Sequence, residues 1–185
     1  MSLRDDEFRV LRQTIAVRGT VRMVLVPLTL FGWALLAGAL VIFSEWPIAA
    51  LLSLGVLVGG FEAIHGLHVG VERLGRYIQV YYESEASGPQ WESTAMRLGP
   101  GLPGGGVDPL FTVVFVGSAL ANLLTVFIPP PPTSEAALPV ILHAAFIIRV
   151  VRARRAAARQ RGNELEMFKQ VRAEGTTPPP TSPSR

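Results

Sequence analysis

The stretch MVLVPLTLFGWALLAGALVIF, residues 23–43, decides the fold class, because its 21 residues carry no charge. A helix needs about 20 apolar residues to cross the roughly 30 Å hydrocarbon core of a bilayer. The stretch follows 22 residues that include five arginines, and no small-residue cleavage site clearly follows it. These features distinguish it from a signal peptide. We therefore predict a membrane helix that is retained in the protein, over 23–44.

Further apolar runs indicate that the chain crosses the membrane more than once. Trp46 opens the next run and suits the membrane–water interface. The last run is the weakest, because Arg149 follows only 13 apolar residues, and it reaches spanning length only if that side chain extends toward the interface. We predict three more membrane helices, over 46–71, 109–128 and 134–151.

The 17 basic residues indicate both the number of spans and their orientation. With four spans, five basic residues precede the first span, three lie between the second and third, and nine lie from Arg149 onward. The two remaining loops contain none. Because cytoplasmic segments are enriched in Lys and Arg, this distribution predicts that both termini are cytoplasmic. A model with three spans would instead place nine basic residues across the membrane.

The fold class that we predict is an all-α integral membrane protein with four transmembrane helices in two hairpins. The N-terminal segment carries Phe8, Leu11 and Ile15 at helical spacing, which is typical of an amphipathic helix on a membrane surface. Spans two and four are expected to continue as cytoplasmic helices. The predicted cytoplasmic parts are an amphipathic segment over 1–22, a helix to about 84, a Gly/Pro loop over 85–108, a basic helix to about 173 and a disordered tail over 174–185.

Composition excludes several classes of function. The chain contains no Cys, which excludes disulfide scaffolds, thiol enzymes and Cys-based zinc sites. Neither a dinucleotide-binding nor a P-loop motif occurs, and HExxH is absent. The basic residues fit a membrane orientation signal, so we predict no nucleic-acid partner. All of them except Lys169 are arginine, which is typical of a GC-rich bacterial genome and suggests the bacterial inner membrane.

The second span carries polar residues that are costly inside a membrane. A charge at the centre of a span costs at least about 2.5 kcal/mol, which makes Glu62 the most informative residue. At 100° per residue it shares a stripe with His65, and His68 lies at the edge of that stripe. Counting depth inward from His68 on the second span and from Arg149 on the fourth, we predict that Glu62, His65 and His143 occupy one layer.

Four glycines follow the same span beside the polar stripe. They form two GxxxG motifs within an arc of about 60°, and small residues at this spacing allow another helix to approach closely. We predict that they pack against a helix of the same chain or of a second copy. The four residues are Gly55, Gly59, Gly66 and Gly70.

The polar cluster permits three interpretations. In the first, it is a structural cluster in which Glu62 pairs with His65, His143 or Arg149. In the second, it is a haem b site held by His143 together with His65 or His68. In the third, it is the proton-binding site of a small transporter that uses Glu62. The Glu62-x-x-His65 spacing also occurs in di-iron bundles, but such a site needs two of these motifs and further carboxylates. We therefore predict no metal site, and haem is the single cofactor considered.

We favour the first interpretation and expect a small structural or accessory subunit of a larger membrane assembly, or a homo-oligomer. The haem-binding redox subunit and the proton-coupled transporter are the alternatives. No nucleophile with a matched base and acid is evident, which argues against an enzyme. The expected partners are a protein and membrane lipid, the latter contacted by basic residues outside the spans: Arg73, Arg76, Arg152, Arg154 and Arg155.

Overall fold

The computed structural model describes residues 3–44, 46–83, 90–98, 109–128 and 133–176, and every regular element within these ranges is helical. This confirms the predicted all-helical class for the described part of the chain. The elements are α1 (Leu3–Phe43), the short 3₁₀ helix η1 (Pro47–Ala49), α2 (Ala50–Tyr81), α3 (Trp91–Leu98), α4 (Pro109–Thr125) and α5 (Thr133–Thr176).

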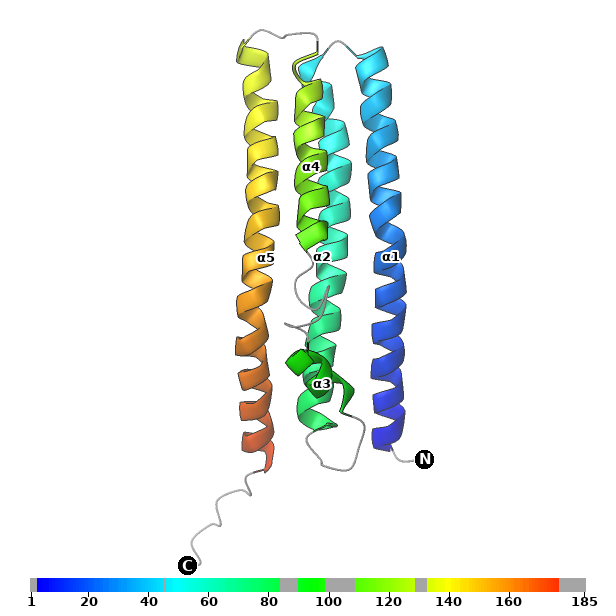
Figure 1. The fold of residues 1–185 in the computed structure, drawn as a ribbon, viewed down its shortest axis with the longest axis vertical. Coiled ribbons are helices and arrows are strands. Elements are labelled where there is room, and N and C mark those ends of the chain that lie inside the picture. The colour runs from blue at the N-terminus through cyan, green and yellow to red at the C-terminus, as the bar shows by residue number, and fades with distance from the viewer. Residues whose placement is uncertain (1–2, 45, 84–89, 99–108, 129–132, 177–185) are drawn as a thin grey trace, which may run out of the picture.

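The helices α1, α2, α4 and α5 lie side by side along one axis (Figure 1). α1 has 41 residues and α5 has 44, so at 1.5 Å per residue both are about 60 Å long, roughly twice the thickness of a hydrocarbon core. The beginning of α1 and the end of α5 lie at the same end of the bundle. We call this end of the bundle the terminal end. The other end, where α1 stops and α2 starts, is called the opposite end.

Three of the described helical segments are long and apolar enough to cross a membrane. They are Leu3–Phe43, Pro47–Tyr81 and Ser134–Gly175. α4 is also apolar, but it has 17 residues, which is at the lower limit for a span. The structure is therefore that of a membrane-associated helical protein.

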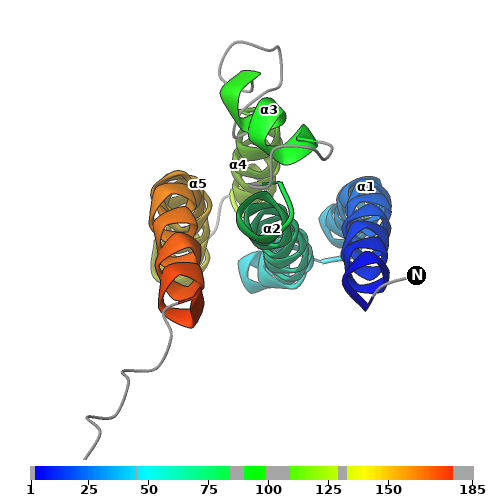
Figure 2. The same cartoon turned by 90° about the horizontal axis from the view of Figure 1, so that it is seen from below.

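α2 is the central helix, with α1 and α5 on opposite sides of it and α4 against a third side (Figure 2). Phe61 of α2 is 1% exposed and forms the centre of the apolar core. Its ring lies 5.4 Å from Phe115 and 5.7 Å from Phe111 of α4, and 5.8 Å from Phe146 of α5. These ring contacts hold the three helices together over their middle portion.

α1 contacts α2 most closely at Gly60. A Cβ atom at this position would lie 2.1 Å from Cγ2 of Thr29, so only glycine allows the two helices to approach this closely. Thr29 and Ala37 are the only buried residues of α1. Most of the apolar surface of α1 therefore remains open to its surroundings, as expected for a helix in contact with lipid.

The structure refines the sequence-based boundaries in two places. Residues 3–22, predicted as a separate amphipathic segment, continue directly into α1, so Pro27 lies inside a helix and not near the start of one. A helix, α3, forms within the predicted Gly/Pro loop. The buried carboxylate of Glu83 stabilises its first turn by accepting hydrogen bonds from the backbone N–H groups of Glu92 and Ser93, each at 2.7 Å. The predicted disordered tail lies outside the described residues beyond Thr176.

Candidate functional site

A buried hydrogen-bond network connects α1, α2, α4 and α5 near the opposite end, and Asn122 of α4 lies at its centre. The Asn122 amide oxygen accepts hydrogen bonds from Ser53 Oγ at 2.6 Å and from Trp33 Nε1 at 3.2 Å. Its amide nitrogen donates to the carbonyl oxygen of Ala50 at 2.9 Å and to Nε2 of His143 at 2.8 Å. These four bonds use both donors and both acceptor positions of a fully buried side chain.

The contacts of His143 define which of its ring nitrogens carries the proton. Nδ1 lies 2.7 Å from the carbonyl oxygen of Pro139, which can only accept, so Nδ1 is the donor. Nε2 accepts from the Asn122 amide, whose second hydrogen is directed at Ala50. The neutral tautomer thus satisfies every partner, and both ring nitrogens are occupied within the protein.

His143 does not share a layer with Glu62 and His65, contrary to the sequence-based prediction. It lies beside the Ala50 carbonyl, and His65 is 15 residues farther along α2, about 22 Å at 1.5 Å per residue. The prediction placed Arg149 at the membrane boundary, whereas the structure places it level with Glu62. Since His143 also has no unoccupied ring nitrogen, this arrangement does not fit a haem held by His143 and a second histidine.

Glu62 pairs with Arg149 on the outer surface of the α2–α5 pair. Oε2 of Glu62 lies 2.8 Å from Nη2 of Arg149, and the two side chains remain 44% and 45% exposed. The Arg149 guanidinium also lies 5.7 Å from the ring centroid of Phe61. Of the three partners predicted for Glu62, the structure selects Arg149. The pair faces away from the core.

The predicted glycine stripe is largely open within one copy of the chain. A Cβ atom at Gly55, Gly59 or Gly66 would meet nothing within 4 Å, whereas one at Gly70 would lie 2.6 Å from Nη1 of Arg18. The first three glycines therefore do not pack against another described helix. Close packing occurs instead at Gly60, which the sequence analysis did not identify.

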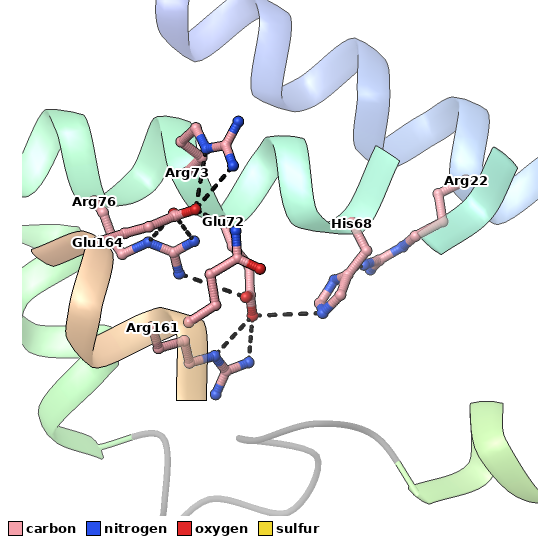
Figure 3. A network of polar contacts seen from close by, with 8 residues as sticks. Arg22, His68, Glu72, Arg73, Arg76, Arg161 and Glu164 are labelled. Carbon is pink, nitrogen blue, oxygen red and sulfur yellow. Dashed lines mark hydrogen bonds and ion pairs between the residues drawn. The ribbon is translucent and has the colours of Figure 1, made fainter. Parts of the chain in front are cut away.

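Toward the terminal end, ion pairs join α2 to α5 (Figure 3). The Glu164 carboxylate accepts a hydrogen bond from Nη2 of Arg73 at 2.9 Å, and from Nε and Nη2 of Arg76 at 3.0 and 2.5 Å. Gln160 also donates to it. Burial alone would raise the pKa of Glu164, but the hydrogen bonds from Arg73, Arg76 and Gln160 outweigh burial and lower this pKa to about 2.

Glu72 extends this group of charges toward the middle of the bundle. It accepts hydrogen bonds from Arg161 and lies 3.5 Å from Nη1 of Arg76 and 3.4 Å from Nε2 of His68. Burial opposes ionisation of Glu72, but the hydrogen bond from Arg161 and the neighbouring positive charges lower its pKa overall. We call Glu72, Arg73, Arg76, Arg161 and Glu164 the α2–α5 ion cluster.

The basic residues predicted to contact lipid fall into two groups. Arg73 and Arg76 both pair with Glu164; Arg76 is buried, whereas the Arg73 side chain remains 55% exposed. Those on α5, in contrast, are exposed and have no hydrogen bond or ion pair with any described residue: Arg152, Arg154 and Arg155. Contact with an external anion is therefore open to the second group.

A partly enclosed cavity of about 270 Å³ lies between the aromatic core and the ion cluster. All four helices α1, α2, α4 and α5 line it, and most of its lining is apolar. His65 and His68 border it together with Arg22 and Arg154, whereas Glu62 is not part of its lining. A transporter that uses Glu62 would need this carboxylate in such a cavity, so the geometry does not favour that alternative. Within the described ranges, no group of three or more His, Asp or Glu side chains is arranged to hold a metal ion.

Comparison with protein-family models, with curated proteins and with solved structures found no match to this chain.

Replacing Asn122 with Leu is expected to lower the free energy of unfolding by about 2 kcal/mol, since four interhelical hydrogen bonds in a membrane protein contribute about 0.6 kcal/mol each. Thermal unfolding in detergent micelles, followed by circular dichroism, measures the loss. Leu120→Ala, at a half-exposed position of the same helix, is the control and should lower the free energy of unfolding by less. Equal stability of the two variants would contradict a central role for Asn122.

The Glu164 ion pairs are expected to make stability depend on pH. Because the folded pKa of about 2 lies below the ordinary value of 4.5, the contribution is complete above about pH 5 and is lost as the pH falls toward 2. Unfolding measured between pH 7 and pH 3 should show this loss in the wild type and a smaller one in Glu164→Gln. Glu166→Gln, at an exposed pair on the same helix, should retain the wild-type slope.

Proposed function

We propose that the protein is a structural subunit of the bacterial inner membrane, with four spans, cytoplasmic termini and no catalytic activity, and that it associates with a second copy through α2. The observation that carries this proposal is the outer face of α2. On it an ion pair at membrane depth and three open glycines lie together without a covering helix among the described residues.

The four-span orientation is supported by the distribution of charge along the bundle. The stretches 23–43, 50–61, 111–128 and 136–148 carry no basic residue, and the described arginines other than Arg149, which pairs with Glu62, lie beyond these stretches toward the terminal end. Placing that end in the cytoplasm satisfies the positive-inside rule. α4 is short, but its 17 residues and the turn that follows are sufficient for a thin or locally adapted bilayer.

The structural role is supported by how the polar side chains are used. Asn122, His143 and Glu164 are buried, and each makes its hydrogen bonds to other residues of the same chain. Among the described side chains, Gln79 Oε1 is the one buried polar atom without a partner. Groups that satisfy one another in this way set the register of helices, and leave little capacity for chemistry on a substrate.

Self-association through α2 is supported by the character of its outer face. Gly59 and Gly66 permit close approach of another helix, which is how helices commonly associate in membranes. An ion pair facing lipid is unfavourable, and a second copy would remove it from lipid. In a two-fold dimer Glu62 of one copy would face Arg149 of the other, so the surface is complementary to itself.

The orientation can be tested with single cysteines, because the chain has none of its own. Ser134→Cys, near the start of α5, is expected to react with a membrane-impermeant maleimide added to intact spheroplasts. Gln170→Cys, near its end, should react only after lysis. Both residues are exposed, so accessibility to water on each side decides the result. Labelling of Gln170→Cys in intact spheroplasts would reject cytoplasmic termini.

Association through α2 can be tested at Gly59. Gly59→Leu is expected to reduce dimer formation about tenfold or more, because the larger side chain prevents close approach. It should leave the monomer intact, since a Cβ atom there meets nothing within 4 Å. Gly38→Leu on α1, which is equally open, is the matched control and should dimerise normally. Analytical ultracentrifugation in density-matched micelles measures the monomer–dimer equilibrium.

Disulfide cross-linking in native membranes provides an independent measurement. Ala63→Cys lies on the exposed side of α2 and should form a cross-linked dimer on mild oxidation, whereas Leu28→Cys, exposed on α1 at a similar depth, should not. Equal cross-linking at both positions would indicate random collision and would reject this interface. Cross-linking of Ala63→Cys to a different protein would support an accessory subunit in a larger assembly instead.

A further inference from the structure

The cavity between the four helices combines an apolar interior with a basic rim. Its apolar lining includes Leu30 of α1, Ile64 of α2, Phe111 of α4 and Val150 of α5. Arg22 of α1 and other cationic residues border it on the side nearer the terminal end. An apolar cavity of about 150 Å³ is large enough to bind benzene, so a volume of about 270 Å³ has room for a longer hydrocarbon segment.

The positive charges at this rim are not neutralised by the described residues. Nη1 of Arg22 lies 2.8 Å from Nδ1 of His68. Because arginine can only donate, Nδ1 accepts, and the remaining proton of His68 lies on Nε2, which faces Glu72. Arg22 is thus bonded to a neutral ring and not to a carboxylate. Arg154, from the other side of the cavity, makes no ion pair within the described part of the chain.

We propose that this cavity binds one acyl chain of an anionic phospholipid, with the lipid phosphate held between Arg22 and Arg154. The inference rests on the proposed orientation, which places the rim at the cytoplasmic boundary of the membrane. Basic pockets between membrane helices on that side are suited to anionic headgroups. An arginine fork matches the oxygens of a phosphate, and the apolar lining matches the hydrocarbon chain that follows it.

The positive charge at the rim favours an anionic lipid over a zwitterionic or uncharged one. A phosphatidylcholine headgroup would bring its own quaternary ammonium close to two guanidinium groups, at an electrostatic cost. Soluble phosphate would satisfy the guanidinium groups but leave the apolar cavity without hydrocarbon. Phosphatidylglycerol supplies a net negative charge and an acyl chain together, so it is the probe that distinguishes these cases.

Binding can be measured by native mass spectrometry on the delipidated full chain in dodecyl maltoside, titrated with palmitoyl-oleoyl phosphatidylglycerol. We expect one saturable site, with much weaker binding of the phosphatidylcholine of the same chains and of glycerol 3-phosphate. Arg22→Gln/Arg154→Gln should weaken binding of phosphatidylglycerol about thirtyfold. Arg155→Gln/Arg159→Gln removes the same charge from exposed positions of α5 and should change it less than about threefold.

A second pair of variants tests the hydrocarbon part of the site. Thr112→Phe places a ring in the cavity and should weaken phosphatidylglycerol binding while leaving both arginines in place. Val113→Phe adds the same ring at the next residue, on the exposed side of α4, and should bind as the wild type does. Equal effects of the two substitutions would reject occupation of the cavity by an acyl chain.

Other results of the lipid-binding titration would contradict a specific part of the proposal. Equal affinity for phosphatidylglycerol and phosphatidylcholine would overturn the role of the charged rim, and tight binding of glycerol 3-phosphate would identify a soluble-anion site instead. Gly59→Leu should bind lipid with wild-type affinity, because Gly59 does not line the cavity. A wild-type chain that forms dimers but does not bind phosphatidylglycerol would therefore reject this inference alone. Release of the chain from membranes by alkaline carbonate would reject the proposed function.

Discussion

The four hydrogen bonds of Asn122 are the interaction on which the arrangement of the helices depends. In an apolar environment, each unpaired donor or acceptor of this amide would be costly, so the side chain favours the one arrangement that satisfies all of them. That arrangement brings Trp33, Ser53 and His143 from three other helices to the same point. Apolar packing alone is less selective, because lipid chains solvate apolar side chains about as well as neighbouring helices do.

The two ends of the bundle use different interactions, and the environment of each explains the choice. Near the opposite end, Asn122 and His143 are neutral, which suits a region from which water is excluded. Toward the terminal end, Glu72 and Glu164 are ionised and pair with arginines of the partner helix or their own. In the proposed orientation that end lies outside the membrane, where water hydrates charged groups during folding, so the cost of bringing them together is moderate.

The sequence predicted the class of the fold and part of the polar site. The apolar runs predicted the helical class, and Arg149 was among the partners predicted for Glu62, with which it pairs. Two features could not be predicted. The depth of His143 was counted from Arg149, whose true depth is set by its pairing with Glu62. Nothing in the sequence around Glu164 identified it as the partner of two arginines 88 and 91 residues away. These contacts depend on the relative shift of α2 and α5, which a single sequence does not specify.

α2 carries the two proposed interaction surfaces on different sides. Its buried side carries Phe61 and Ile64 into the core and the cavity, while its outer side carries Gly59 and Glu62. Because these two sets project from different sides of one helix, occupation of the cavity and association with another copy do not compete for the same surface. Adjacent residues of α5 contact both sides, since Arg149 pairs with Glu62 and Val150 lines the cavity. A displacement of α5 along α2 would therefore alter the cavity and the outer ion pair together. The position of α5 thus couples the two surfaces.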